Sequence, residues 1–219
     1  MIDEIELARQ KLILDAKSIV DDEPIQWFDQ LYKIASRDSN MIPWARMAAN
    51  PKMLEWLKEN NCSGKALVVG CGLGDDAVAL EKLGFQVTAF DISKHCINWC
   101  KERFPNSKVE WIVGDILKPL EQWQNYFDLV VEIHILQAIP DGGVREQAAE
   151  QLPKLLAKEG LLLCIGRLDN GKQSITPPPW PLKQKWLENS FSKLKPNNFK
   201  IFYYHDSIDI ARYYGSWRK

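Results

Sequence analysis

This sequence of 219 residues has no excess of either sign of charge, no long apolar run and no even number of cysteines. Its 28 Lys and Arg residues against 29 Asp and Glu residues give a net charge of −1. Such a balance argues against nucleic acid or a membrane surface as the main partner. No segment approaches the roughly 20 apolar residues that cross a bilayer, so we expect no membrane-spanning helix.

The five cysteines are an odd number, and residues 1–10 are acidic without the apolar core of a signal peptide. We therefore expect free thiols in a reducing compartment, which predicts a cytoplasmic protein. Cys96 and Cys100 lie one helical turn apart, but no further pair at a suitable spacing completes a zinc site. The sequence thus predicts core cysteines and no bound metal.

The composition that is present is typical of a globular protein. Hydrophobic residues make up 46% of the chain and charged residues 26%, and we expect one domain over residues 1–219. The nine tryptophans are unusual, and most of them fall in the flanks, outside residues 65–170. Residues 171–219 carry 9 basic and 3 acidic residues, a surplus that predicts a solvated face or, alternatively, a surface for an anionic substrate or partner.

Helical spacing of apolar residues predicts an N-terminal helical arm and cofactor lid over residues 1–64, with a turn-rich segment at 36–43. From Lys65 short apolar strands alternate with helices, which predicts an α/β fold. We expect this fold to contain a doubly wound, mostly parallel sheet with helices on both faces. Residues 65–170 then form the cofactor-binding core, and residues 171–219 form a substrate-side extension. We expect helices at 1–20, 25–34, 51–60, 76–83, 93–104, 143–156 and from about 182, and strands at 66–69, 87–90, 109–113, 127–133, 161–165, 199–204 and 211–217.

Glycines and acids gather where the first three strands of the core are predicted to end. Gly70, Gly72 and Gly74 follow the first strand, and such a loop lets the backbone turn sharply and approach a ligand. Asp91 closes the second strand, about 20 residues further on, where a carboxylate accepts the hydroxyls of a ribose. Asp115 follows the third strand. Because the carboxyl ends of parallel strands meet at one edge, the sequence predicts a site for a cofactor that contains adenosine.

The acids after the glycine loop distinguish between two such cofactors. A dinucleotide site favours a small residue at the position of Asp75, and the pair Asp75 and Asp76 would repel a pyrophosphate. The sulfonium and ammonium groups of S-adenosyl-L-methionine suit two acids better. The pattern therefore favours S-adenosyl-L-methionine, and an NAD-dependent oxidoreductase is the least favoured alternative.

With these features the sequence resembles the class I S-adenosylmethionine-dependent methyltransferases, most closely their thiopurine, thiol/halide and tellurite-resistance branch. The resemblance covers roughly residues 42–170. Val68 departs from it, because many members carry an acid two residues before the first glycine. The methionine amino group must then find other acceptors, such as backbone carbonyls, Asp75 or Asp76. The segments that carry the resemblance are IPWAR at 42–46, ALVVGCGLGDDA at 66–77, VTAFDIS at 87–93, GDI at 114–116, FDLVVE at 127–132 and LLAKEGLLL at 155–163.

The resemblance implies a role for each residue of the site. Asp91 binds the ribose, Ile92 packs on the adenine, and residues 115–116 contact the edge of the adenine. Trp44 lines the methionine end, where an aromatic face attracts a sulfonium, or alternatively fills the core. Glu132 faces the methyl-transfer region. The expected cofactor contacts are Trp44, Arg46, Gly70, Cys71, Gly72, Gly74, Asp76, Asp91, Ile92, Ser93, Asp115, Ile116 and Glu132.

Methyl transfer from a sulfonium is a direct displacement, which depends mainly on in-line alignment and leaves S-adenosyl-L-homocysteine. The resemblance favours a small-molecule acceptor, and a thiol or other chalcogen nucleophile needs no strong base. For a hydroxyl or amine, Glu132 and His134 are the candidate catalytic bases, because a spacing of two places them on one side of a strand end. A methyltransferase for protein or nucleic acid and a silent cofactor-binding protein are alternatives, and the oligomeric state is left open.

Overall fold

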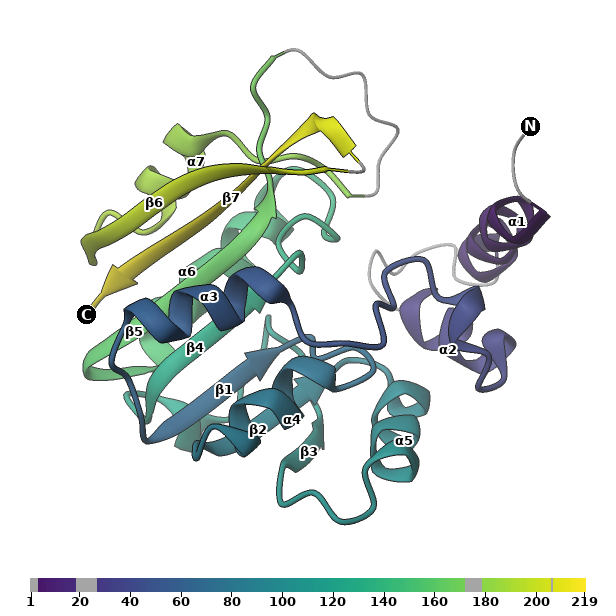
Figure 1. Cartoon of the computed structure of the whole chain (residues 1–219), viewed down its shortest axis with the longest axis horizontal. Coiled ribbons are helices and arrows are strands. Elements are labelled where there is room, and N and C mark those ends of the chain that lie inside the picture. Colours follow the sequence, from purple (N-terminus) through teal and green to yellow (C-terminus); the bar gives the residue numbers. More distant parts are fainter. Residues whose placement is uncertain (1–3, 19–26, 172–178, 206) are drawn as a thin grey trace.

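The computed structural model describes residues 4–18, 27–171, 179–205 and 207–219 (Figure 1). Its centre is a seven-stranded sheet in the order β3-β2-β1-β4-β5-β7-β6. The first five strands are parallel, and β7 runs antiparallel between β5 and β6. The strands are β1 (Lys65–Val69), β2 (Gln86–Asp91), β3 (Glu110–Val113), β4 (Phe127–Ile133), β5 (Leu156–Arg167), β6 (Lys195–Tyr204) and β7 (Ser207–Arg218).

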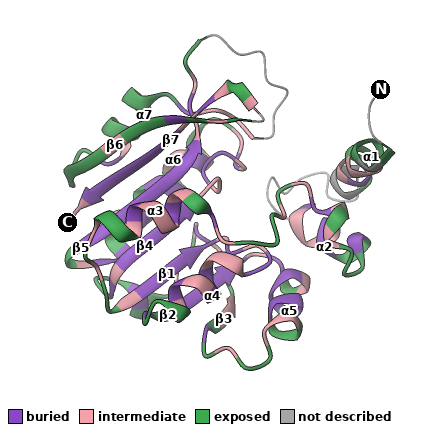
Figure 2. Ribbon diagram, viewed as in Figure 1, coloured by how far each residue is buried: buried purple, intermediate pink, exposed green. Residues whose placement is uncertain are grey.

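Helices cover both faces of this sheet. On one face lie α3 (Pro51–Glu59), α4 (Asp75–Lys82) and α5 (Lys94–Arg103), and on the other α6 (Gly143–Leu155) and α7 (Gln184–Ser190). The strands are apolar on both sides, so successive residues of β4 enter separate cores, with Val131 in the first and Val130 in the second. Figure 2 shows the central strands buried and the outer helix faces exposed. The predicted α/β fold with a doubly wound, mostly parallel sheet is confirmed.

The N-terminal arm lies beside the end of the sheet toward which β1 points (Figure 1). It contains α1 (Glu4–Ser18) and α2 (Trp27–Ala35), and a short 3-10 turn, η1 (Ser39–Met41), lies in the segment predicted to be turn-rich. α2 packs against α5, with the rings of Tyr32 and Trp99 edge to face at 6.5 Å. None of the helices in the described ranges is long and apolar enough to cross a membrane.

Three strands are longer than the sequence predicts. β5 begins at Leu156 instead of 161, because Leu156 already pairs with Phe127. The register then shifts, so that the next pair is Leu129 with Leu161 and the polar residues between 156 and 161 form a bulge. β6 and β7 extend beyond 199–204 and 211–217, since backbone pairing between them continues through alternating polar residues. The proline-rich segment TPPPWP at 176–181 begins outside the described residues, which resume at 179.

Candidate functional site

The glycine loop after β1 is held in a conformation that favours glycine. Gly70, Gly72 and Gly74 have φ values of 56°, 52° and 87°. A Cβ atom on Gly70 would lie 2.3 Å from Ile135 Cδ1, and one on Gly74 would lie 2.6 Å from Trp111. At Gly72 the nearest atom is the Tyr32 hydroxyl, 3.6 Å away. The outer two glycines are therefore required by packing, whereas Gly72 faces the aromatic residues of the arm.

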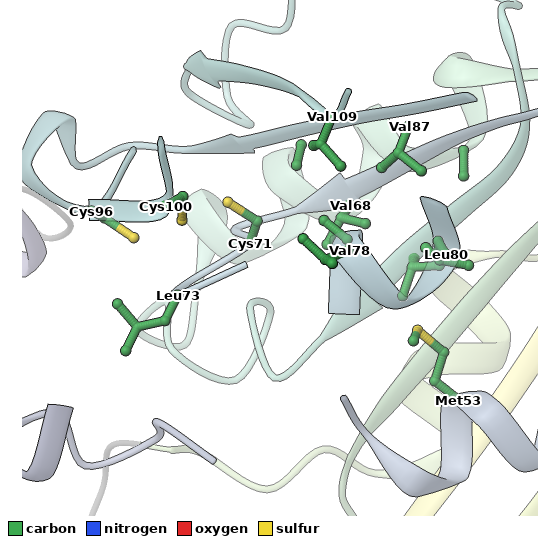
Figure 3. Close-up of a cluster of buried hydrophobic side chains, with 14 of the residues drawn as sticks. Met53, Val68, Cys71, Leu73, Val78, Leu80, Val87, Cys96, Cys100 and Val109 are labelled. Atoms are coloured by element: carbon green, nitrogen blue, oxygen red, sulfur yellow. The ribbon is translucent and has the colours of Figure 1, made fainter. Parts of the chain in front are cut away.

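Three thiols approach the same side of this loop. Cys96 Sγ and Cys100 Sγ donate to the carbonyl oxygen of Gly72 at 2.8 and 3.0 Å, and Cys71 Sγ lies 3.7 Å from it. Figure 3 shows these cysteines at one edge of the buried apolar cluster that includes Val78. Within the described ranges, no group of three or more His, Cys, Asp or Glu side chains is arranged to hold a metal ion. The cysteines thus fix the backbone orientation of the loop.

Asp91, the last residue of β2, joins the loop to the start of α5. Its Oδ2 accepts a hydrogen bond from the Gly72 amide at 3.1 Å, and its Oδ1 accepts one from the Ser93 amide at 3.0 Å. Ser93 is the N-cap of α5, where its hydroxyl accepts from the Cys96 amide. Burial raises the pKa of Asp91 to about 6. Each carboxylate oxygen has a second lone pair that a ligand hydroxyl can use.

The arm is attached to this site through Asp29 of α2. Its carboxylate accepts from the Ser93 hydroxyl at 2.7 Å and from the His95 amide at 3.1 Å. The ring of His95 adds a contact of 2.9 Å between Nδ1 and Asp29 Oδ2. His95 falls within the helix predicted at 93–104, and the sequence gives no role to Asp29. The structure instead makes them the polar link between the arm and the strand end that carries Asp91.

Trp44, one of the expected cofactor contacts, lies over the glycine loop. Its Nε1 donates to the Tyr32 hydroxyl at 2.9 Å, and its Cδ1 lies 4.0 Å from the Cβ position of Gly72. The ring makes edge-to-face contacts with Trp27 and Phe28 at 6.2 and 5.6 Å. Trp44 remains 38% exposed, so it is not a core residue in this arrangement. Tyr32, which the sequence assigns only to a helix, completes this aromatic wall.

The two acids after the loop have different partners. Asp75 forms a bidentate ion pair with Arg103, with N–O distances of 2.8 and 2.9 Å. Asp76 accepts from the Asn50 amide at 2.6 Å, and burial raises its pKa to about 6 although the charge of Arg46 opposes this. Of the two acids expected to accept the methionine amino group, only Asp76 keeps a carboxylate oxygen without a cationic partner among the described residues.

The remaining expected adenine contacts lie after β2 and β3. Ile92 is half-buried and directly follows Asp91. Asp115 Oδ1 accepts from the Leu117 amide at 2.8 Å, a local turn that leaves its other oxygen for a ligand. Ile116 is buried in the core on the α6 side of the sheet. The amide of Gly114 donates to the carbonyl of Asp91 at 3.0 Å, which brings these two strand ends together.

Glu132 is buried at the end of β4, with its side chain 1% exposed. Its Oε1 accepts from the amides of Ile135 and Leu136 at 2.6 and 3.1 Å. Oε2 is buried and has no hydrogen-bond partner in the described part of the chain. Burial raises the pKa of Glu132 to about 7, so the carboxyl group is partly protonated at neutral pH. Its contacts position the loop after β4.

His134 does not continue the alternation of β4, because the strand ends at Ile133 and His134 has a φ of 64°. Gln137 fixes its tautomer. The Gln137 side chain donates to the Arg167 carbonyl at 2.5 Å, while its Oε1 accepts from the Arg167 amide at 2.7 Å. Since Oε1 can only accept, His134 Nδ1, 2.9 Å away, is the donor. Nε2 is therefore an acceptor.

The pKa of His134 falls to about 4 through burial and through the charges of Arg167, Arg212 and Arg46. The ring is thus neutral at pH 7 and a weak base. Trp180 lies nearby, because its amide donates to the Gln137 carbonyl at 2.8 Å. The predicted placement of Glu132 and His134 on one side of a strand end is wrong, because β4 ends at Ile133 and only Glu132 belongs to it.

Comparison with known proteins agrees with this geometry. Residues 67–164 match the family described as a methyltransferase domain. The chain is 28% identical over 134 residues to a probable thiol methyltransferase 2 of Arabidopsis thaliana, an alignment that covers 59% of this chain and 58% of the plant protein. The chain thus spans less than two thirds of that relative.

Two solved structures share the fold. One was described in work on the conversion of a disulfide bond into a thioacetal group during echinomycin biosynthesis, with a TM-score of 0.72, 20% identity and coverage of 88% of this chain and 91% of that chain. The other is the N-methyltransferase NodS of Bradyrhizobium japonicum in complex with S-adenosyl-L-homocysteine, with a TM-score of 0.62, 18% identity and 99% of each chain covered.

Proposed function

We propose that the chain is a class I methyltransferase that transfers the methyl group of S-adenosyl-L-methionine to a small-molecule nucleophile. Its fold and the methyltransferase-domain family that residues 67–164 match support this proposal. The observation that carries the proposal is the position of the Asp91 carboxylate. It bonds to the Gly72 amide on one side, and Trp44 lies against Gly72 on the other. An adenosine ribose fits beside the carboxylate, and a sulfonium fits against the tryptophan face.

The residues present fit such a cofactor. Asp91 would accept from the ribose hydroxyls, Ile92 and the turn at Asp115 would contact the adenine, and Asp76 would accept from the ammonium group. When bound, the cofactor supplies an electrophilic methyl group on a cationic sulfur. The chain's own contribution is to align the acceptor with that methyl group and to exclude water through the arm.

For the acceptor we propose a thiol. A thiolate is already a strong nucleophile, and nearby cationic groups lower the pKa of a thiol. The site offers such groups in Arg167 and Arg212, whose charges reach His134. Among the described residues it offers no accessible strong base, because the pKa of His134 is about 4 and Glu132 is buried with Oε1 bonded to the loop amides. The relative described as a probable thiol methyltransferase supports the same class.

Binding and turnover test the two parts separately. Titration calorimetry with S-adenosyl-L-methionine, S-adenosyl-L-homocysteine and NAD should give saturable binding of the first two only. Incubation with S-adenosyl-L-methionine and a panel of small thiols should then release S-adenosyl-L-homocysteine together with a thioether. Binding of NAD alone would contradict the cofactor, and turnover of alcohols or amines without thiols would contradict the acceptor.

A further inference from the structure

Three arginines from distant parts of the chain meet near the carboxyl-terminal end of β5, beside His134. Arg167 ends β5 and is the register partner of Arg212 in β7, so both side chains project from the same face of the sheet. Arg212 and Arg46 both lie over the ring of Tyr204, with guanidinium carbons 4.7 and 5.5 Å from its centroid. We call Arg46, Arg167 and Arg212 the arginine cluster.

Two of the three guanidinium groups are not ion-paired within the described part of the chain. Within the described ranges, Arg46 and Arg167 have no carboxylate within ion-pair distance. Arg212 contacts the carbonyl oxygens of Ile210 and Ser207 at 3.1 and 3.5 Å, among other contacts. Burial and the neighbouring charge of Arg212 lower the pKa of Arg167. Arg167 and Arg212 are half-buried, whereas Arg46 is exposed. Gathering like charges where two of them are partly desolvated destabilises the fold, a cost that is typical of a site built for a ligand.

The surroundings restrict the side chains of Arg46 and Arg212 and the backbone of Arg167. The Tyr204 ring stacks with two of the guanidinium groups, and Gln137 bonds to the backbone of Arg167 through both atoms of its amide. His134, bonded to the same Gln137, presents only a neutral acceptor nitrogen. A planar guanidinium offers a fork of donors that matches an oxyanion better than a spherical anion.

We propose that the arginine cluster binds an oxyanion group, a carboxylate, sulfonate or phosphate, that the methyl acceptor carries in addition to its nucleophilic sulfur. This rests on the proposed function, since it names the class of acceptor for the same site. The cluster lies beside the loop after β4, and Ile135 of that loop contacts Gly70 of the cofactor loop. An acceptor anchored by its oxyanion at Arg167 would therefore have its other end directed toward the cofactor. The substrate class is a small mercapto acid.

The first experiment compares short thiols that carry different polar groups, of which 3-mercaptopropionate and its amide are the pair of similar shape. The full-length protein is assayed with 3-mercaptopropionate, 3-mercaptopropionamide, 2-mercaptoethanesulfonate and 2-mercaptoethyl phosphate, and kcat/KM is measured from S-adenosyl-L-homocysteine release. We expect the acids to exceed the amide by at least about tenfold, as for one charge-assisted hydrogen bond. The order among the three acids identifies the oxyanion. Equal kcat/KM for acid and amide would overturn the proposal.

The second experiment removes one arginine. In Arg167→Gln the preference for acid over amide should fall to about one, through KM, while Arg167→Lys should keep part of it because the charge remains. Arg218→Gln is the matched control, since Arg218 lies at the far end of β7 and donates to the Glu159 carbonyl. The dissociation constant of S-adenosyl-L-homocysteine should stay unchanged in all three. A loss of its binding in Arg167→Gln would show that the cluster binds the cofactor's own carboxylate, and would overturn the proposal.

A third measurement reads the cluster without turnover. Propionate and propionamide are titrated by calorimetry into the protein saturated with S-adenosyl-L-homocysteine, and into the protein alone. Saturable binding of propionate that is lost in Arg167→Gln and kept in Arg218→Gln supports the cluster as an oxyanion site even if no tested thiol is methylated. Absence of such binding overturns it. Failure of S-adenosyl-L-homocysteine to bind would instead contradict the proposed function.

Discussion

The amide of Gly72 donates to Asp91 Oδ2 at 3.1 Å, so that the glycine loop after β1 and the end of β2 form one rigid unit. The same carboxylate accepts from the Ser93 amide, which sets the start of α5. One buried side chain thereby controls the shape of the surface on which we place the ribose. The charge of Asp91 also depends on pH near neutrality, because burial raises its pKa to about 6.

Asp91→Asn should weaken S-adenosyl-L-homocysteine binding by about ten- to a hundredfold, the effect of one or two hydrogen bonds to a charged acceptor. The asparagine oxygen still accepts from one amide, but its NH2 group faces the other, so we expect a loss of about 1–3 kcal/mol of stability while the fold is kept. Calorimetry and thermal unfolding measure the two effects. Asp128→Asn is the matched control, because Asp128 accepts from the Lys65 amide at the opposite end of β1. Unchanged affinity in Asp91→Asn would contradict the ribose assignment.

The wild-type affinity should also fall as the pH falls through about 6. A protonated carboxyl group accepts less well from the ribose hydroxyls, so binding is strongest where Asp91 is ionised and is lost on the acid side. The dissociation constant of S-adenosyl-L-homocysteine measured between pH 5 and 8 checks this. In Asp91→Asn the curve should be shallower through this range, and the slope that remains is expected from Asp76, whose pKa is also about 6. A slope as steep as that of the wild type would contradict the assignment to Asp91.

Trp44→Ala should lower cofactor affinity by about tenfold while leaving stability nearly unchanged, because the side chain is 38% exposed and faces Gly72. Trp56→Ala provides the contrast, since Trp56 is fully buried and its truncation should cost about 3–5 kcal/mol of stability. Denaturant unfolding and calorimetry on both variants separate the two roles. A larger loss of stability than of affinity in Trp44→Ala would make it a core residue.

Much of the fold could be predicted from the sequence because its signals are local. Apolar runs of four to seven residues define the parallel strands, and the glycines after the first of them define the loop. Asp91 could be singled out by its distance along the chain from Gly70, since a β–α–β unit has a nearly constant length. The polar alternation in β5, β6 and β7 carries a weaker signal, and there the predicted strands are too short.

The residues that the sequence did not identify act through contacts between distant segments. Asp29 matters only because α2 reaches the start of α5, and Arg167 only because β7 places Arg212 beside it. His134 follows the strand in sequence, but a left-handed backbone turns it out of the strand pattern. No spacing rule could predict these contacts, because each depends on how the chain returns to the same edge of the sheet.

Asp29→Ala should release the arm from the site. The variant loses the bonds to the Ser93 hydroxyl and to His95, so we expect weaker S-adenosyl-L-homocysteine binding by about tenfold and faster hydrogen exchange in α2. Arg37→Gln is the control, because the ion pair between Arg37 and Glu102 also joins the arm to α5 but is exposed, and exposed pairs contribute little to stability. Equal effects of the two variants would contradict a specific role for Asp29.

Glu132→Gln should change how stability depends on pH. The folded protein raises the pKa of Glu132 to about 7 from 4.5, so the unfolded chain ionises first and the native state is destabilised as the pH rises from about 4.5 to 7. A shift of this size corresponds to about 3 kcal/mol at most. Glutamine cannot ionise, and its oxygen can still accept from the amides of Ile135 and Leu136.

We therefore expect wild type and Glu132→Gln to differ little in stability near pH 4.5, and the variant to be the more stable near pH 7. Urea unfolding at several pH values gives the difference in stability between the two proteins. The titration of His134, whose pKa is lowered, affects both proteins equally and cancels in this difference. A variant that is less stable than wild type at pH 7 would show that the ionised carboxylate has a partner, and would place Glu132 among the groups that carry charge in the folded site.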